Sequence, residues 1–304
     1  MWARPRLELT LRMPQAIGMS SRTGGERVKL RRVPALPQLE LMRATYVQQR
    51  FARHAHEGFA VGVIESGALG FFYRGENVVA ARGAVNLANP DEPHTGHAAV
   101  PEGWTYRMFY LPAEGLKQAA CQIAGRRVPL PFFPAGVIQD DALAATIRGA
   151  HVTLEDDGVS TLERESVVLL MLSCLIRRYA DAPPVPLRIG NERTPVQRAR
   201  DYIEAHCTED VSIRCLAAVA RLSPYHFIRV FRQELGLPPH SYLKQVRVRR
   251  ARRLLSLGWS ISAAALETGF VDQSHLARNF KQVLGFTPGQ FRNFVQYGSP
   301  QHYA

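Results

Sequence analysis

The sequence predicts an α+β protein of two domains, with a β-rich N-terminal domain followed by an all-α C-terminal domain. Residues 39–135 consist of short apolar runs punctuated by Gly, Pro and Asn, which is typical of strands. Helical periodicity takes over from about Asp140, and one motif occurs twice in the last third of the chain. With 304 residues and 46% hydrophobic content, the chain can form two cores.

The first 38 residues are rich in Arg and Pro and are expected to form a flexible N-terminal arm. They contain no continuous apolar segment of the kind that a secretory signal needs, and no run in the chain approaches the roughly 20 apolar residues of a membrane span. The four cysteines show no paired metal-ligand spacing, which suits a reducing compartment. We therefore expect a cytoplasmic protein without membrane contact.

Within the β-rich region, residues 60–64, 69–73 and 105–111 are clear strand candidates because Gly or Pro follows each run closely. The tetrad Ser160-Thr161-Leu162-Glu163 resembles a capping box and predicts a helix that runs to about Tyr179. This helix carries an apolar stripe, which we interpret first as a core face and second as a dimer seam. The stripe consists of Leu162, Leu169, Leu172, Leu175 and Ile176. The Pro-rich residues 181–193 predict a linker, so the domains should span residues 39–180 and 194–298.

The duplicated motif repeats His, Arg, Phe, a basic residue, Gln, Leu, Gly and Pro at the same offsets. Its first copy runs from His226 to Gly236, and its second runs from His275 to Gly285. Two basic copies of one unit within a single chain suggest two nucleic-acid-reading elements.

Each copy lies in a predicted helix-turn-helix. In the first unit, Ser212 is placed to cap one helix, Arg221-Leu222 forms the turn, and Ser223 caps the second helix ahead of Pro224. In the second unit, the first helix starts at Ser260-Ile261, and Asp272 takes the capping role that Ser223 has in the first.

The second helix of each unit is expected to pack with one face and to enter a major groove with the other. Phe227, Val230 and Phe231, with Leu276 and Phe280 in the second copy, form the packing faces. The residues expected to contact DNA are Tyr225, His226, Ile228, Arg229 and Arg232 in the first helix and Gln273, Ser274, His275, Arg278 and Lys281 in the second. The alternative, solvated basic faces without a partner, does not account for the duplication.

A long helix is predicted between the two units, from Ser241 to Leu257, with Gly258 as the residue that ends it. It carries Arg247, Arg249, Arg250, Arg252 and Arg253. A stiff connector of this kind would fix the spacing of the two reading helices, which should enter successive major grooves roughly 34 Å apart.

Charge agrees with this interpretation. Residues 193–297 contain 16 Lys and Arg against 7 Asp and Glu, which places +9 of the overall net charge of +12 in this region. A basic excess concentrated in one domain is typical of polyanion binding. Attraction to a membrane surface is the competing explanation, and no other feature of the sequence supports it.

Residues 194–294 resemble the DNA-binding domain of the AraC/XylS family of transcriptional regulators. The resemblance is carried by Ser212-Ile213, Leu216-Ala217, Phe231, Gly236, Pro239, Tyr242, Arg247, Ala251, Leu254-Leu255, Gly269-Phe270, Phe280, Gly285, Thr287-Pro288 and Phe291-Arg292. It implies binding to double-stranded promoter DNA. The chain departs from the family pattern at Ala263-Ala264, where an acidic residue and a larger aliphatic are usual.

The β-rich region resembles the cupin-like sensor module that precedes many such domains. The match rests on His54-Ala55-His56-Glu57, Gly62 to Gly67, Tyr73-Arg74-Gly75, Gly83 and the run from Asn89 to Gly96. The resemblance implies a cupin-like antiparallel β-barrel with an internal pocket, followed by a helical dimerisation segment. Candidate effector-binding residues are His54, His56, Glu57, Tyr73, His94 and Tyr106, and Arg74 and Arg107 would suit a carboxylate or polyol.

The pattern His54-x-His56 with His94 also raises the question of a metal, since enzymatic cupins use such a set together with a carboxylate. Histidines two apart on a strand share a face, but Glu57 would point away and Glu65 lies nine positions beyond His56. We therefore expect no metal and no cofactor, and interpret the histidines as structural or effector-binding.

The function that the sequence predicts is a non-enzymatic, sequence-specific transcriptional regulator controlled by a small-molecule effector in the barrel. Its expected partners are promoter DNA, the effector, a second copy of the chain in a homodimer and, if it is an activator, RNA polymerase. Two alternatives stay open. One is a metal-dependent cupin enzyme with a DNA-binding appendage, and the other is an effector-independent regulator whose barrel only dimerises.

Overall fold

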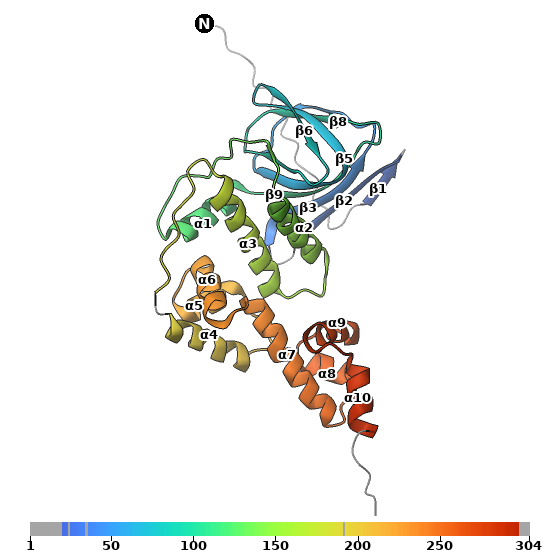
Figure 1. Ribbon diagram of the computed structural model, residues 1–304, viewed down its shortest axis with the longest axis vertical. Helices are drawn as coiled ribbons and strands as arrows, with labels where there is room; N and C mark the ends of the chain where they lie inside the picture. The colour runs from blue at the N-terminus through green and yellow to red at the C-terminus, as the bar shows by residue number, and fades with distance from the viewer. Residues whose placement is uncertain (1–19, 24, 34–35, 191, 298–304) are drawn as a thin grey trace, which may run out of the picture. The chain divides into compact units, whose positions relative to one another are not determined.

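The computed structural model describes residues 20–23, 25–33, 36–190 and 192–297 (Figure 1). Residues 1–19 of the expected arm therefore lie outside the described part of the chain. The chain divides into two compact units. The β-rich unit comprises the residues up to Glu155 together with Val167–Pro186, and the helical unit comprises Asp156–Ser166 and the residues from Leu187 onward.

Antiparallel strands form the β-rich unit. They are β1 (Ser20–Thr23), β2 (Glu26–Val33), β3 (Leu36–Tyr46), β4 (Phe51–His54), β5 (Phe59–Tyr73), β6 (Glu76–Ala81), β7 (Val85–Ala88), β8 (His94–Ala98), β9 (Trp104–Leu111) and β10 (Val137–Ile138). The main path through the sheet is β1-β2-β3-β9-β5-β7-β10, while β6 and β8 also pair with β5, and β4 pairs with β8. The expected antiparallel sheet domain is confirmed.

Strands β1 (Ser20–Thr23) and β2 (Glu26–Val33) fall in the stretch expected to be a flexible arm. Strand β2 pairs with β3 from Arg27 opposite Thr45 to Arg32 opposite Glu40. In β2 the apolar Val28 and Leu30 alternate with basic residues. That period of two is typical of a strand with one packed face, and the sequence analysis overlooked it because Arg dominates the composition.

Strand β5 connects the two halves of the sheet. Its first half pairs with β7 and β9, and its second half pairs with β6 and β8. The register with β9 shifts between Ile64 and Ser66, and the next residue, Gly67, has a φ of 69°. A β-bulge with a left-handed residue bends the strand, which lets one strand serve two sheets.

The barrel core lies between these two sheets. It contains Met42, Ala44, Ala60, Ile64, Leu69, Phe71, Tyr73, Ala80, Ala84, Ala88, Trp104, Tyr106 and Met108. On β9 the inward Trp104, Tyr106 and Met108 alternate with Arg107 and Phe109, which contact His151 of a helix outside the barrel. Alternation along the strand therefore directs one set of side chains into the barrel and the other towards α2.

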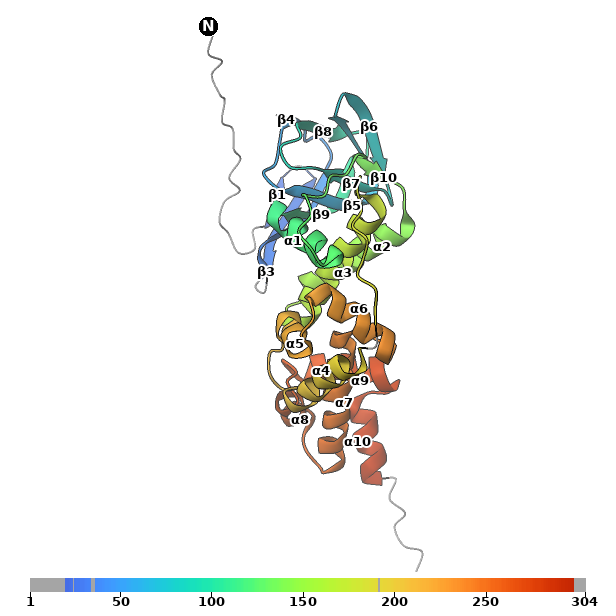
Figure 2. The same cartoon turned by 90° about the vertical axis from the view of Figure 1, so that its left-hand side faces the viewer.

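Three helices accompany the strands: α1 (Ala113–Ala124), α2 (Asp141–Glu155) and α3 (Thr161–Tyr179), gathered at one side of the sheet (Figures 1 and 2). Helix α1 was not predicted, because it lies in the region expected to be all β. Ser160 caps α3, because the Glu163 amide donates to Ser160 Oγ over 3.3 Å, but the Glu163 side chain accepts from Lys244 instead of completing a capping box.

The apolar stripe of α3 is a core face. Leu162, Leu172, Leu175 and Ile176 are each no more than 5% exposed, and Leu169 is half-buried. A homodimer stays a prediction, and these residues are too buried within the chain to form its seam.

A buried charge network links β9 to α2. Arg107 Nη1 donates to Glu155 Oε2 at 2.7 Å and lies 3.1 Å from His151 Nδ1, while His151 Nε2 lies 3.3 Å from the Met42 carbonyl. A neutral His151 protonated on Nε2 satisfies both contacts. Burial, and to a lesser degree the charge of Arg107, hold the pKa of His151 below its usual range against the opposing effect of Glu155.

The helical unit contains α4 (Arg193–Ala205), α5 (Ile213–Ala220), α6 (Pro224–Leu235), α7 (Pro239–Ser256), α8 (Ile261–Glu267), α9 (Gln273–Leu284) and α10 (Pro288–Tyr297). The first turn of α3 belongs to the same unit. Lys244 Nζ lies 2.7 Å from Glu163 Oε1, and the Ile213 amide donates to Glu165 Oε2 over 2.7 Å. Among the residues that the structure describes, no helix has the length and apolar character needed to cross a membrane.

We predict that Gly67→Ala lowers the free energy of unfolding of the β-rich unit by at least about 2 kcal/mol. A Cβ there would lie 1.9 Å from the Gly103 carbonyl oxygen in addition to occupying a left-handed φ. Gly75→Ala is the matched control, since its φ is 92° but a Cβ would meet nothing within 4 Å. Denaturant unfolding of both variants checks this, and equal losses would contradict the role of the close approach.

We also predict acid sensitivity that depends on His151. Because its folded pKa is lowered, the contribution of neutral His151 is present above its unfolded pKa of about 6.5 and is lost as the pH falls towards the folded value. His151→Gln, whose amide can accept from Arg107 and donate to Met42, should reduce the loss of unfolding free energy between about pH 7 and pH 5 by roughly 1–2 kcal/mol. Identical pH profiles for the two proteins would contradict the prediction.

Candidate nucleic-acid interface and histidine site

Both helix-turn-helix units begin their helices at the predicted caps. The side-chain oxygens accept backbone N–H bonds three residues on: Ser212 from Cys215 (3.1 Å), Ser223 from His226 (3.3 Å), Ser260 from Ala263 (3.2 Å) and Asp272 from His275 (2.7 Å). These bonds satisfy donors that a helix start leaves free. The caps predicted at Ser212, Ser223 and Asp272 and the helix start predicted at Ser260 are confirmed.

The turns between the paired helices depend on left-handed residues. Arg221 has a φ of 58° after α5, and Gly269 has a φ of 79° after α8. A Cβ on Gly269 would lie 3.0 Å from the Thr208 backbone, so this turn also requires close approach to another segment. The left-handed backbone redirects each chain into its second helix.

The second unit has a compact core around α7, α8 and α9. It contains Val248, Ala251, Leu255, Ala264, Ala265, Phe270, Leu276 and Phe280. Ala264, one of the two positions that depart from the family pattern, is fully buried there. The small side chain lets α8 pack in contact with its neighbours.

Helix α9 presents the face expected to contact DNA. Gln273, Ser274, Arg278 and Lys281 are exposed, and His275 is half-buried. Arg278 Nη2 lies 3.8 Å from Asp156 Oδ2, but its side chain remains 65% exposed. An exposed pair at this distance holds the side chain weakly, so a phosphate or base could replace Asp156.

Helix α6 differs from the expectation. Tyr225, His226 and Ile228, expected on the outward face, are buried, while Arg229 is half-buried and Arg232 exposed. The segment before α4 accounts for part of this burial.

Two contacts connect that segment to α6. Arg229 Nη1 donates to the Leu187 carbonyl over 2.9 Å, and His226 Nε2 lies 3.6 Å from Glu192 Oε1. Sequence periodicity could not reveal this cover because the covering residues lie in the Pro-rich linker.

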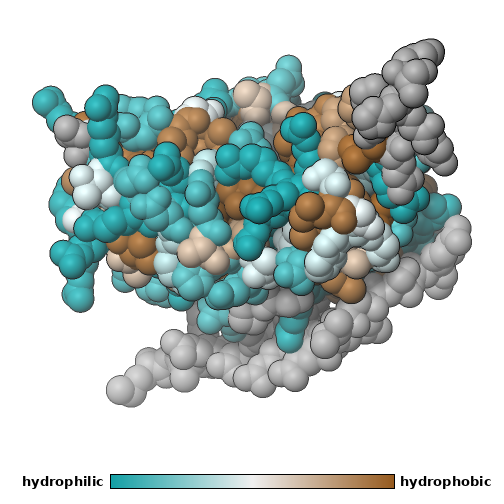
Figure 3. Space-filling model, turned by 90° about the horizontal axis from the view of Figure 1, so that it is seen from below, coloured by the Kyte–Doolittle hydropathy of each residue, from teal (hydrophilic) through white to brown (hydrophobic). Residues whose placement is uncertain are grey.

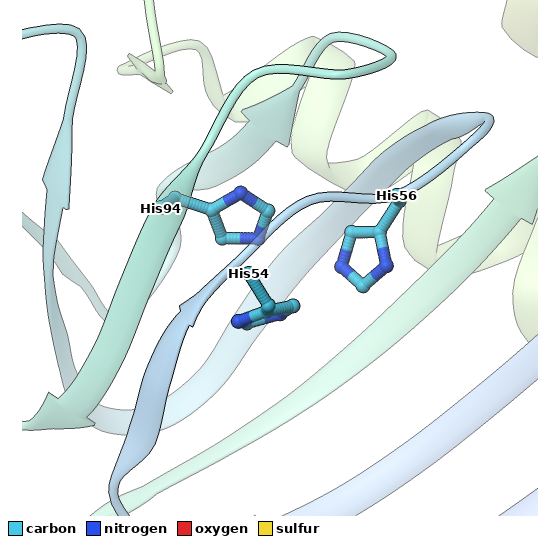
Figure 4. A group of neighbouring side chains, drawn as sticks. All are labelled: His54, His56 and His94. Carbon is cyan, nitrogen blue, oxygen red and sulfur yellow. The ribbon is translucent and has the colours of Figure 1, made fainter. Parts of the chain in front are cut away.

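In the β-rich unit, the three candidate histidines converge (Figure 4). His54 ends β4 and His94 begins β8, and they are direct cross-strand partners. His56 follows in the loop after β4, where its carbonyl accepts from the Asp91 amide over 2.8 Å. One ligand atom from each ring lies within 4.8 Å of the others, and all three side chains are half-buried.

Two of the rings are oriented in the same way. His54 Nδ1 lies 2.8 Å from the Ala52 carbonyl, and His94 Nδ1 lies 2.9 Å from the Glu92 carbonyl. Burial, followed by the charges of His94 and His54, lowers the pKa of His56 to about 4. Burial also lowers the pKa of His94, although its bond to Glu92 opposes the effect.

The other effector candidates lie in different surroundings. Glu57 is exposed and is not part of the cluster, while Tyr73 and Tyr106 are buried in the barrel core. Arg107, suggested as a pocket residue, faces α2 instead, because it alternates with the inward Tyr106 on β9.

The turn leading to β8 is anchored by Asn89. Its Nδ2 donates to Tyr73 Oη at 2.9 Å and to the Phe133 carbonyl at 2.8 Å, and the Phe133 amide donates to Asn89 Oδ1 at 3.0 Å. Asn89 is only 2% exposed, so these bonds are shielded from water.

An aromatic group that the sequence analysis did not single out surrounds the histidines. The His56 ring lies 5.3 Å from Tyr110, and Phe51 lies 6.0 Å from His54 and 6.3 Å from Trp104. Trp104 Nε1 is buried and has no hydrogen-bond partner among the described residues. Alternation of Trp104, Tyr106 and Tyr110 along one strand is the sequence signal that could have identified this group.

Two family models match this chain, one in each domain. Residues 36–172 match the model of the AraC-like ligand binding domain, and residues 216–293 match a helix-turn-helix domain. Together these ranges cover more than half of the chain. The chain belongs to the AraC family of transcriptional regulators.

Relatives of this AraC-family protein include an uncharacterized HTH-type transcriptional regulator, YbfI of Bacillus subtilis. The two are 28% identical over 238 residues, which cover 78% of this chain and 86% of YbfI. The bifunctional transcriptional activator and DNA repair enzyme Ada of Escherichia coli is 35% identical over 83 residues, and the match spans only 27% of this chain and 23% of Ada.

Among solved structures, a probable AraC family transcriptional regulator from Rhodopseudomonas palustris is similar. It is 30% identical, with 35% of this chain and 99% of that chain covered and a TM-score of 0.32.

The surface of the AraC-type helical domain is strongly basic along α7. Figure 3 shows the molecule from below, and hydrophilic side chains on that face lie between hydrophobic patches. Arg249, Arg250, Arg252 and Arg253 are exposed, but Arg247 is buried. Arg247 donates to the backbone carbonyls of Cys207 and Glu209, so it fastens α7 to the loop before α5. Arg247 therefore has a structural role, unlike the four exposed arginines of α7.

We predict that Arg247→Ala lowers the free energy of unfolding of the AraC-type helical domain by roughly 2–4 kcal/mol, because two backbone carbonyls lose their donor. Arg253→Ala, with the same loss of charge, should change it by less than about 0.5 kcal/mol and should reduce the salt dependence of DNA affinity by about one phosphate contact. Unfolding curves and salt titrations on both variants separate the roles. An unfolding transition of Arg247→Ala equal to that of Arg253→Ala would contradict them.

Proposed function

We propose that this regulator reads specific double-stranded promoter DNA with α6 and α9 and is controlled by a small ligand bound in its β-rich domain. The observation that carries the proposal is the pair of capped helix-turn-helix units, one of which presents an exposed basic reading face on α9. A helix exposed in this way fits the major groove, where base edges can be distinguished.

In the proposed complex, phosphate contacts position the protein and a few side chains read bases. Exposed arginines of α7 and Lys281 supply phosphate contacts. Gln273, Ser274 and Arg278 reach base edges, because Gln pairs well with adenine and Arg with guanine.

For α6 to read DNA, Leu187 and Glu192 have to leave its face. The two contacts that hold them, Arg229 with Leu187 and His226 with Glu192, would then be exchanged for contacts with DNA. An effector that favours release strengthens DNA binding, and by linkage DNA then strengthens effector binding by the same factor.

The ligand of the β-rich domain binds, in this proposal, beside the histidine cluster. The aromatic group supplies apolar surface, and the unpartnered Trp104 Nε1 supplies a donor. Few convergent polar groups within aromatic surroundings are typical of small-molecule sites.

In this proposal the protein is a cytoplasmic homodimer. Its β-rich domain acts as a sensor and not as an enzyme. The carboxylates close to the cluster in sequence support a sensor role, since Glu57 is exposed and Glu65 is bound to Arg148 over 2.7 Å. A general acid or base would have to lie within hydrogen-bond reach of the reacting group.

The test is selection of genomic DNA fragments by the purified full chain at stated salt, followed by affinity measurement. We expect a pair of boxes about one helical turn apart. Arg278→Ala should weaken binding to the selected site by about 1–3 kcal/mol and relax preference at one base pair.

Arg193→Ala is the matched control, because the Arg193 side chain is 84% exposed on α4 and the substitution removes the same charge as Arg278→Ala. It should leave the base preference unchanged. Equal losses for Arg278→Ala on selected and random duplexes would make Arg278 a phosphate contact, and the absence of any enriched motif would overturn sequence-specific recognition.

A further inference from the structure

We propose that His54, His56 and His94 form a binding site for a divalent transition metal ion of the zinc class, and that this ion takes part in the ligand control of the β-rich domain. The second part rests on the proposed function. The proposal replaces the expectation from sequence that no metal binds here.

The spacing of the rings fits one ion. The three ligand atoms lie within 4.8 Å of one another, and the ring centroids are 4.5 to 5.0 Å apart. A tetrahedral ion with metal–nitrogen bonds of about 2.0–2.1 Å holds its ligand atoms roughly 3.4 Å apart. Side-chain rotation can close the difference, because the rings already point toward a common centre (Figure 4).

The backbone holds the three histidines in place before any ion binds. His54 and His94 are opposite each other in the β4–β8 pair, and the Asp91 amide bonds to the His56 carbonyl. Strand β8 is also paired with β5, where His94 lies opposite Tyr73. Ligands on a rigid scaffold lose little conformational entropy on binding, which favours metal affinity.

Two of the rings have the hydrogen bonds that metal-binding histidines usually have. Nδ1 of His54 and Nδ1 of His94 each donate to the carbonyl two residues earlier, which leaves the Nε2 lone pair free. The tautomer follows from these bonds, since a carbonyl can only accept.

A purely structural histidine in this chain looks different. His151 has a partner at each ring nitrogen, Arg107 at one and the Met42 carbonyl at the other. Within the described residues, Nε2 of His54 and Nε2 of His94 have no such partner, and one ligand atom of each of the three rings lies within 4.8 Å of the others. Three imidazoles whose lone pairs converge do not stabilise one another, but they can share a cation.

The ligand set selects the class of metal. The cluster contains only imidazoles among the residues that the structure covers. Imidazole suits Zn²⁺, Cu²⁺, Ni²⁺ and Co²⁺, whereas Mg²⁺ and Ca²⁺ require oxygen ligands, and the non-haem iron oxygenases use a carboxylate with two histidines. Three protein ligands at half-buried positions leave a coordination position open for water or a small anion.

The test is titration of the tag-free full chain with Co²⁺ alone, followed by Zn²⁺ displacement. We expect one Co²⁺ per chain, with the visible d–d bands of a four- or five-coordinate site, and loss of those bands on adding Zn²⁺. His56→Gln should weaken Co²⁺ binding by more than about 100-fold. Removing a residue that only hydrogen-bonds to a metal ligand typically costs about 10–100-fold. Absence of stoichiometric binding to the wild-type chain overturns the proposal.

Two further variants keep the test decisive. His94→Gln should also lose Co²⁺, and it covers the case in which His56→Gln fails to fold, with circular dichroism as the check. His97→Gln, on the same strand as His94 but outside the cluster, should bind Co²⁺ like the wild type. Equal binding by all three variants would place the ion elsewhere and overturn the site.

DNA affinity separates this proposal from the proposed function. The same protein, with and without Zn²⁺, is measured on the selected genomic fragment. A Zn²⁺-dependent shift of at least about fivefold that is absent in His56→Gln supports the regulatory role. If the metal binds but DNA affinity does not change, the regulatory role is overturned and the metal site stands. If the protein binds no genomic fragment specifically, the proposed function is overturned and the Co²⁺ result is unaffected.

Discussion

The pairing of β5 with four other strands is the constraint on which the β-rich domain depends. The strand belongs to one sheet through β7 and β9 and to the other through β6 and β8, with the bend at Gly67 between them. The histidine site follows from this arrangement, because β8 is held by β5 and β4 is held by β8. The side chains that converge in the barrel therefore owe their positions to a glycine on a different strand.

Local sequence signals predicted the helical domain well. The four N-caps, the left-handed Gly258 after the long helix and the two turns depend on residues within a few positions of one another. Such signals are readable from one sequence because the hydrogen bonds they form are local. The β-rich domain was harder to predict from sequence. The arginines of β2 masked its alternating apolar pattern, and α1 lies between segments that resemble strands.

The roles of several candidate site residues depend on tertiary contacts that the sequence does not reveal. The pattern His54-x-His56 was visible, but only the antiparallel register places His94 opposite His54. Periodicity assigned Tyr225 and Ile228 to an outward face and could not foresee that both would be buried. Arg247 resembles its neighbouring arginines in sequence, and only its contacts with two backbone carbonyls distinguish a structural role from a DNA contact.

Asn89 gives the histidine site a mechanical connection to the helices. Its buried amide is bonded at the same time to Tyr73 and to both backbone groups of Phe133, which precedes β10 and α2. Each of these bonds would cost about 1–3 kcal/mol if broken without a replacement. The turn that leads to His94 is therefore tied directly to the segment that leads into α2.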